Sequence, residues 1–280
     1  MKIAVCLKHI IGPPSSGLAG TGAPLRHSPN PLDLSAIEEA LRLRAGSGGS
    51  EVVVVTAGPP QAELTLNRAI AMGADKAIRV WDEAMCGADS FFTAEVLCAT
   101  LRATGFDLIL CGSRSADTGS GIVGALLAEE LELPLIAGAL GLKYDERTNR
   151  ISADKKLERG VRETYTTCLP AMVTIEHGPN EPRWYGAGWV HRLLKQKIER
   201  RDLRWLGVSF PAQSRRVEIV AVTPPRPRTK LGVNVASLSR EEKLRMMFGQ
   251  TRTSAGQVRA SDRPEDAARK IKEHLDKWLG

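Results

Sequence analysis

Two hydrophobic patterns alternate along the chain from residue 2 to residue 131. Short apolar runs rich in branched side chains, each of a length typical of a buried strand, cover Lys2–Leu7, Glu51–Ala57, Ala77–Trp81 and Leu108–Cys111. Longer runs with apolar residues at helical spacing follow them, at Leu34–Ala45, Ala62–Met72, Phe91–Thr104 and Ile122–Leu131. Strands that alternate with helices predict right-handed βαβ units and a parallel sheet covered on both faces.

The pattern changes after Pro134. Short segments separated by turns resemble an antiparallel addition to the sheet, at Leu140–Tyr144, Arg150–Lys156 and Arg162–Cys168. A buried strand returns at Pro170–Ile175, and a helical run follows at Val190–Arg200. The sequence therefore predicts an α/β fold, Rossmann-like and doubly wound, with a mostly parallel sheet, a small antiparallel addition and an extended C-terminal arm.

Two further stretches are expected to be irregular. The segment from Gly12 to Pro31 reads as a long loop between the first strand and the first helix. After Trp205 the periodicity fades, Pro224–Arg228 reads as an extended linker, and an amphipathic helix is predicted at Pro264–Leu279. We therefore expect two parts, an α/β domain at residues 1–205 and a C-terminal arm at residues 206–280 that needs a partner surface for its helix.

The loop Gly112–Gly121 lies between a predicted strand and a predicted helix. This is the geometry in which backbone N–H groups and the positive end of a helix dipole converge on a phosphate, and the Ser and Thr hydroxyls would add donors. It is neither a P-loop nor a G-x-G-x-x-G fingerprint. An ordinary βα connection has the same residue types, so this loop alone leaves both interpretations open.

Other segments that follow or end predicted strands favour the nucleotide interpretation. Ligands of parallel α/β sheets bind beyond the carboxyl ends of the strands. One crevice there could be lined by Cys6, Asn30–Asp33, Ala57-Gly58 and Gly112–Gly121. Within this set, Asp33 also has an alternative role, because either Asp33 or Ser35 would serve as the N-cap of the first helix.

Charge is distributed unevenly along the chain, whose net charge is +7. Residues 1–182 contain 17 Lys and Arg against 22 Asp and Glu, whereas residues 183–280 contain 22 against 10. A nucleic-acid arm or a tail that wraps an acidic partner protein would both look like this. Because aromatic residues are few and no nucleic-acid motif is present, we expect a protein partner and no nucleic acid.

Several function classes are disfavoured. The five cysteines are widely spaced without a C-x-x-C motif, which argues against zinc and disulfide frameworks. No apolar run approaches the roughly 20 residues of a membrane span, and the N-terminus lacks a signal-peptide pattern, so we expect a cytoplasmic protein that is not membrane-embedded. No nucleophile, base and acid occur in a recognisable catalytic order, so we expect no enzyme activity.

Six motifs together resemble those of the beta subunit of electron-transfer flavoprotein. The likeness begins with Met1–Val5 and Lys8, and it continues with Asn30-Pro31 ahead of Glu38–Leu43 and with Ala69–Lys76. It also includes the loop Gly112–Leu131 with Gly112, Asp117 and Gly124, the region Lys155–Thr174, and Asn180–Arg183. The resemblance covers roughly residues 1–200.

The resemblance implies a non-enzymatic electron carrier that pairs with an alpha subunit holding FAD. The beta subunit of that family binds AMP or, in electron-bifurcating members, a second FAD. By motif position this nucleotide would contact Cys6, Asn30, Pro31, Leu32, Asp33, Ala57, Gly112, Ser113, Arg114, Ser115, Asp117, Thr118, Gly119, Ser120, Gly121, Ile122 and Val123. The C-terminal arm resembles the one that embraces the alpha subunit.

Residues 183–191 resemble the family's recognition loop. That loop docks onto partner proteins, which implies an acyl-CoA or other dehydrogenase as donor and an electron-accepting oxidoreductase as acceptor. The partner contacts would then be Trp184, Tyr185, Ala187 and Trp189. Alternatively, Trp184 and Trp189 pack under the C-terminal arm as core residues.

A second functional class is an enzyme or sensor of the adenine nucleotide hydrolase-like superfamily. Such an enzyme would use the same crevice to activate a substrate with ATP. It would need a pyrophosphate-binding Ser-Gly-Gly-x-Ser/Thr type of loop after the first strand, and Cys6–Pro14 contains none. The sequence therefore favours the electron-carrier subunit.

Overall fold

The structure is a computed structural model of the 280-residue chain. It describes residues 1–12, 26–186, 188–207, 216–217, 220–221, 239–241, 243, 272 and 276. Contacts divide the chain into two compact units, Met1–Glu218 and Ile219–Gly280. Nearly all described residues belong to the first unit. The predicted linker Pro224–Arg228 lies outside the described residues, and so does the predicted helix Pro264–Leu279 except for Lys272 and Asp276.

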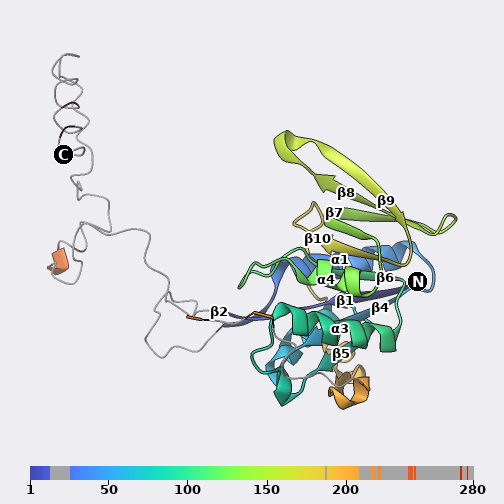
Figure 1. The fold of residues 1–280 in the computed structure, drawn as a ribbon, viewed down its shortest axis with the longest axis horizontal. Coiled ribbons are helices and arrows are strands. Elements are labelled where there is room, and N and C mark those ends of the chain that lie inside the picture. Colours follow the sequence, from blue (N-terminus) through green and yellow to red (C-terminus); the bar gives the residue numbers. More distant parts are fainter. Residues whose placement is uncertain are drawn as a thin grey trace. The chain divides into compact units, whose positions relative to one another are not determined.

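A nine-stranded sheet forms the centre of the first unit (Figure 1). Its strands lie in the order β11 (Ile198–Arg201), β5 (Lys76–Val80), β4 (Glu51–Ala57), β1 (Lys2–Cys6), β6 (Leu108–Gly112), β10 (Ala171–Ile175), β7 (Leu135–Asp145), β8 (Arg150–Lys156) and β9 (Arg162–Cys168). The first seven strands are mutually parallel, and β8 and β9 continue the sheet in antiparallel pairing. The predicted parallel sheet with an antiparallel addition is confirmed.

Helices cover both faces of the sheet. The side chains of β1 alternate, with Ile3 and Val5 on one face and Ala4 and Cys6 on the other. The first pair belongs to the core under α1 (Pro31–Gly46) and α2 (Glu63–Met72), and the second to the core under α3 (Ser90–Thr104) and α4 (Val123–Glu130). The doubly wound architecture is therefore also confirmed.

The first helix begins earlier than its hydrophobic spacing predicts. Helix α1 starts at Pro31, with Asn30 at the N-cap position, so the prediction of Asp33 or Ser35 as N-cap is wrong. Pro31 fits the first helical position because its missing N–H would have no partner there, and its ring presets a helical φ. Asp33 instead lies inside the first turn, where it is buried.

The expected loop between Gly12 and Pro31 is partly a hairpin. Strands β2 (His9–Gly12) and β3 (Arg26–Pro29) pair in antiparallel register. His9 Nδ1 lies 2.9 Å from Thr65 Oγ1, and His9 Nε2 lies 2.9 Å from His27 Nδ1. The first contact joins the hairpin to α2, and the second links its two strands.

The predicted helix Val190–Arg200 is wrong in its second half. Helix α5 covers Trp189–Lys195, and the chain then becomes strand β11, which pairs in parallel with β5. The backbone N–H of Trp81 extends this pairing by donating to Arg201 O at 3.0 Å. Here a long-range sheet partner overrides a local helical pattern.

Candidate functional site

The carboxylate of Asp33 connects three segments at the carboxyl end of the parallel sheet. Its Oδ2 accepts the backbone N–H of Lys8 at 2.6 Å, just beyond β1. Its Oδ1 accepts the backbone N–H of Gly112 at 3.0 Å, at the end of β6, and Asn30 Nδ2 at 2.9 Å. Asp33 therefore fixes the start of α1 against the ends of two neighbouring strands.

Asn30 holds the loop that follows β6. Its Nδ2 donates to Arg114 O at 3.0 Å, and its Oδ1 accepts the backbone N–H of Ala116 at 3.1 Å. Asn30 is 2 % exposed, so both of its polar atoms are satisfied within the protein. The loop is thus attached to the N-terminus of α1 by a side chain 84 residues away along the chain.

Lys8 brings a positive charge to the outer part of the loop. Its Nζ lies 2.8 Å from Asp117 Oδ1 and 3.3 Å from both Ser115 Oγ and Thr118 Oγ1. Burial acts to raise the pKa of Asp117, but the hydrogen bonds from Lys8, Ser115 and the Thr118 N–H outweigh it and lower that pKa to about 2. Asp117 is therefore ionised, and Lys8 stays beside the Ser and Thr hydroxyls.

Two glycines allow the loop to fold back on itself. Gly119 and Gly121 each have φ near +65°, the left-handed region that favours glycine. A Cβ atom at Gly121 would also lie 3.1 Å from Ser113 O. Small residues and exposed backbone therefore line the part of the loop that leads into α4, as close approach to a phosphate requires.

Glu176, the residue after β10, supports the inner part of the loop. Ser113 Oγ donates to Glu176 Oε2 at 2.7 Å, and the Ser113 N–H donates to Ile175 O at 2.8 Å. Arg114 lies 3.6 Å from Glu176 Oε1. The end of β10 and the residue after it thus complete a cradle formed by Lys8, Asn30, Asp33, Gly112–Gly121 and Glu176.

The buried acid of the cradle and two buried thiols near it have shifted pKa values. Burial raises the pKa of Asp33 to about 6, although the donors from Lys8, Asn30 and Gly112 lower it in part. Burial likewise raises the pKa values of Cys6 and Cys111 above their ordinary range. Because both thiols remain protonated and lie in the core under α3 and α4, they are not activated nucleophiles.

The structure brings together most of the residues proposed for nucleotide binding. Asn30 and Asp33 contact the loop directly, Leu32 lies against Gly112, and Cys6 ends the strand between β4 and β6. Ala57 ends β4 at the same edge of the sheet. The remaining predicted residues follow one another in the loop and the start of α4, namely Ser113, Arg114, Ser115, Asp117, Thr118, Gly119, Ser120, Gly121, Ile122 and Val123.

Three contacts of the cradle were missed by sequence reasoning. These are the Lys8 side chain on the loop, the Glu176 support, and the bonds of Asn30 to the loop backbone. Lys8 immediately follows a predicted strand, so its position at the carboxyl edge is a signal that could have identified it. Glu176 similarly follows the strand Pro170–Ile175.

The cradle has the features of an anion site. Gly112 is closely surrounded, since a Cβ atom there would lie 2.5 Å from Asp33 Oδ1, so the loop is held at its root. Beyond this root residues 117–121 are exposed, and those that follow Asp117 have small side chains or none. Such a site can hold an anion, whereas the described residues contain no group of three His, Cys, Asp or Glu suited to a metal ion.

A separate aromatic cluster lies on the segment ahead of α5. Trp184 and Tyr185 have ring centroids 6.4 Å apart, and Tyr185 and Trp189 have centroids 5.4 Å apart. Trp184 is 83 % exposed, and Leu194 of α5 is 78 % exposed. Ala187, the fourth predicted contact, lies outside the described residues.

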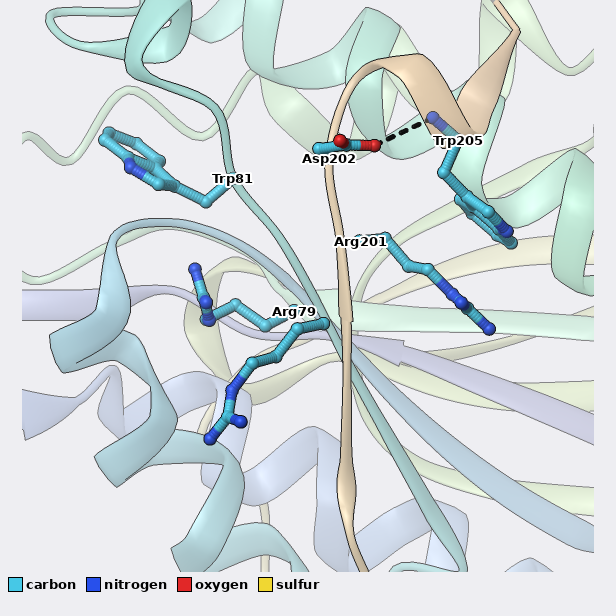
Figure 2. A pocket seen from close by; sticks show the side chains of 6 residues that line it. Arg79, Trp81, Arg201, Asp202 and Trp205 are labelled. Carbon is cyan, nitrogen blue, oxygen red and sulfur yellow. Dashed lines mark hydrogen bonds between the residues drawn. The ribbon is translucent and has the colours of Figure 1, made fainter.

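A shallow cavity of about 420 Å³ lies at the carboxyl ends of β5 and β11, lined by Arg79, Trp81, Arg200, Arg201, Asp202 and Trp205 (Figure 2). Carboxylates already neutralise its cations. Glu63 pairs with Arg79 at 2.9 Å and with Arg200 at 2.8 Å, and Arg201 pairs with Glu199 at 2.9 Å. The three arginines of this cavity are therefore all ion-paired, as Lys8 is with Asp117.

The comparisons with known proteins identify relatives of this chain. The electron transfer flavoprotein domain model matches residues 25–224. Electron transfer flavoprotein subunit beta of Clostridium acetobutylicum is 34% identical over 206 residues, which cover 71% of this chain and 77% of the relative. Subunit CarD of the caffeyl-CoA reductase-Etf complex of Acetobacterium woodii is 31% identical over 206 residues, with the same coverage of 71% and 77%.

A third relative matches a longer part of this chain. Protein FixA of Azotobacter vinelandii is 30% identical over 246 residues, covering 82% of this chain and 86% of the relative. Among the described residues, the helices are too short or too polar to cross a membrane. The matched region contains α1, the loop after β6 and the aromatic cluster, and the chain therefore belongs to the electron transfer flavoprotein family as a protein of the beta-subunit type.

Proposed function

We propose that this chain is the beta subunit of a heterodimeric electron transfer flavoprotein and binds an adenine nucleotide in its cradle. The observation that carries the proposal is the attachment of one exposed, glycine-containing loop to α1 and β1 by Asn30, Asp33 and Lys8. Such an attachment holds backbone N–H groups in place before a ligand arrives. A pre-organised site loses less conformational entropy when it binds.

The residues have distinct roles in this proposal. Backbone N–H groups between Asp117 and Gly121 bind the nucleotide phosphate, and Lys8, which is ion-paired with Asp117, adds a positive charge beside them. Asn30 and Asp33 position the loop and do not need to touch the ligand. AMP in this site would be redox-inert, whereas FAD would supply a second flavin to the electron-transfer complex.

The chain acts as a carrier subunit and not as an enzyme in this proposal. The alpha subunit holds the redox FAD, an acyl-CoA or other dehydrogenase donates electrons, and a further oxidoreductase accepts them. The names of two relatives, a beta subunit and a subunit of a reductase-Etf complex, support such assemblies. The aromatic cluster Trp184, Tyr185 and Trp189 is the proposed contact to the dehydrogenase, because exposed tryptophan and tyrosine are common anchors of interfaces.

The basic C-terminal third supports the proposed heterodimer. Residues 183–280 contain 22 Lys and Arg against 10 Asp and Glu, and the arm at 206–280 is proposed to wrap the alpha subunit as a part separate from the domain at 1–205. We further propose that the complex works in the cytoplasm.

Co-expression of this chain with its alpha subunit tests the proposal. After purification, the nucleotides are released and identified by mass and by their absorption spectra. One flavin together with AMP, or two flavins, is expected for each heterodimer. A complex without any nucleotide beyond the alpha-subunit flavin would contradict the proposed site, and stoichiometric ATP hydrolysis by the chain would favour the adenine nucleotide hydrolase-like alternative.

Substitutions at the left-handed glycines locate the site. Gly119→Val and Gly121→Val should each remove the second nucleotide, because a branched side chain is strained at φ near +65°. Gly48→Val is the matched control, since no atom lies within 4 Å of a Cβ atom there. Full nucleotide occupancy in both loop variants would place the binding site elsewhere.

A further inference from the structure

A carboxylate on α1 binds the residue directly ahead of the aromatic cluster. Glu38 Oε2 accepts the Arg183 backbone N–H at 3.1 Å and its Nε at 2.7 Å, and Glu38 Oε1 accepts Arg183 Nη2 at 2.8 Å. The Glu38 side chain is 7 % exposed, whereas that of Arg183 is 41 % exposed. Burial alone would raise the pKa of Glu38, but the Arg183 hydrogen bonds hold it below its ordinary value, so the pair is charged.

The neighbouring residue Glu39 holds the chain that leads to Arg183. Glu39 Oε1 accepts Asn180 Nδ2 at 2.6 Å, and its Oε2 accepts the Leu142 backbone N–H at 3.0 Å. At Gly178 the chain lies so close to β7 that a Cβ atom would be 1.9 Å from Leu140 O. The segment from Gly178 to Arg183 is therefore fastened to α1 and β7.

Beyond Arg183 the aromatic side chains are exposed, whereas Leu193 of α5 packs against the core. Trp184 is 83 % exposed, and in α5 no residue is buried. Arg183, Trp184 and Trp189 share one hollow of about 210 Å³ with residues at the end of α2. The first residues of this surface are thus held at Arg183, while α5 packs on α2 and leads into β11.

The same helix carries the clamp of the nucleotide cradle. Asn30 and Asp33 at the start of α1 bind the loop after β6, and Glu38 lies one to two turns further along α1. A helix is stiff over such a distance, because every turn is hydrogen-bonded to the next. Helix α1 thus connects the cradle to the attachment point of the aromatic cluster.

We propose that Glu38 is a positioning residue that fixes the docking segment, residues 184–186 and 188–194, relative to the nucleotide cradle. It does so through the fork-like pairing with Arg183, which sets direction as well as distance. This inference rests on the proposed function, in which the docking segment contacts a dehydrogenase. Glu38 itself touches neither the nucleotide nor the partner.

Hydrogen–deuterium exchange on the full-length chain within its heterodimer tests the positioning role. Glu38→Gln and Arg183→Gln should each speed amide exchange in the docking segment by about tenfold, the order expected for the loss of hydrogen bonds to a charged group. The double variant should match the single ones, because both remove the same interaction. Exchange in residues 112–121 and AMP binding should stay near the wild-type values.

Two further variants serve as controls for the exchange experiment. Arg183→Lys keeps the charge but not the fork, so its exchange should fall between that of wild type and that of Arg183→Gln, and it also serves should Glu38→Gln fail to fold. Glu51→Gln breaks the ion pair with Lys76, 2.6 Å long, elsewhere on the sheet and is the control. Unchanged exchange of the docking segment in the Glu38 and Arg183 variants would overturn the inference.

Steady-state kinetics separate this inference from the proposed function. With a dehydrogenase that reduces the wild-type heterodimer, Glu38→Gln should raise the KM for the heterodimer about tenfold while kcat is retained. Trp184→Ala is measured beside it. If Trp184→Ala raises KM and Glu38→Gln does not, the positioning role is overturned; if Trp184→Ala leaves KM unchanged, the docking role itself is overturned.

Discussion

The backbone N–H of Gly112 donates to Asp33 Oδ1 at 3.0 Å, although 79 residues separate the two along the chain. This bond ties the end of β6 to the first turn of α1. Gly112 can approach so closely because it has no side chain, since a Cβ atom would lie 2.5 Å from Asp33 Oδ1 and 2.7 Å from Leu32 Cβ. The geometry of the cradle therefore depends on a glycine at this position.

Gly112→Ala should weaken both the fold and nucleotide binding. The added methyl group must displace Asp33 or Leu32, and overpacking of this kind costs about 1–3 kcal/mol of the free energy of unfolding. Because the displaced carboxylate is the one that holds the loop, AMP affinity should fall as well. Thermal unfolding and titration calorimetry measure the two effects, with Gly48→Ala as the control that should leave both unchanged.

The buried carboxyl of Asp33 should make stability depend on pH. Its pKa rises from an ordinary value of 3.8 to about 6 in the folded protein, chiefly because of burial. A folded-state pKa above the unfolded one means that the folded state binds more protons between these values. The contribution of Asp33 to the free energy of unfolding is therefore fully present below about pH 4, and it is lost as the pH rises through about 6.

Comparison with Asp33→Asn isolates this contribution. A shift of roughly two units corresponds to about 3 kcal/mol, so the wild-type free energy of unfolding should fall by up to that amount, relative to the variant, between about pH 4 and pH 7. Urea unfolding at several pH values measures the difference. Parallel pH profiles for the two proteins would contradict the assignment.

Lys8→Gln should weaken AMP binding by about tenfold while adenosine binding changes little, because Lys8 would interact with the phosphate. Loss of the Lys8 ammonium beside Asp117 should also raise the pKa of that carboxyl toward its ordinary value. Calorimetry at two salt concentrations measures the affinities, and the salt dependence should be smaller in the variant. Lys143→Gln, an exposed lysine of β7, is the control.

The sequence predicts the fold well where the signal is local or repeated. The apolar strands and the helical spacing between them identify a doubly wound sheet, because Ile3 and Val5 face one helical layer while Ala4 and Cys6 face the other. The pattern fails at Val190–Arg200, where the pairing of β11 with β5 ends the helix at Lys195. That pairing connects residues more than a hundred positions apart, and no local periodicity encodes it.

The cradle was predictable as a set of segments but not as a set of contacts. The rule that ligands bind at carboxyl ends of parallel strands pointed to the loop after β6 and to Asn30–Asp33. The role of Asp33 as a partner of Lys8 and Gly112 could not be read from its neighbours in the sequence, which suggest a helix cap. Glu38 and Arg183 lie 145 residues apart, and only the structure shows that they bind each other.

Trp184→Ala distinguishes a docking residue from a core residue. Trp184 is 83 % exposed, so its truncation should change the free energy of unfolding by no more than about 0.5 kcal/mol. At an interface hot spot the same truncation should cost about 2 kcal/mol of binding energy, or about thirtyfold in affinity for the dehydrogenase. Thermal unfolding of the heterodimer and its electron-transfer kinetics are measured side by side. A fall in melting temperature that accounts for the kinetic loss would instead identify Trp184 as part of the core beneath the C-terminal arm, and unchanged kinetics would exclude it from the docking surface.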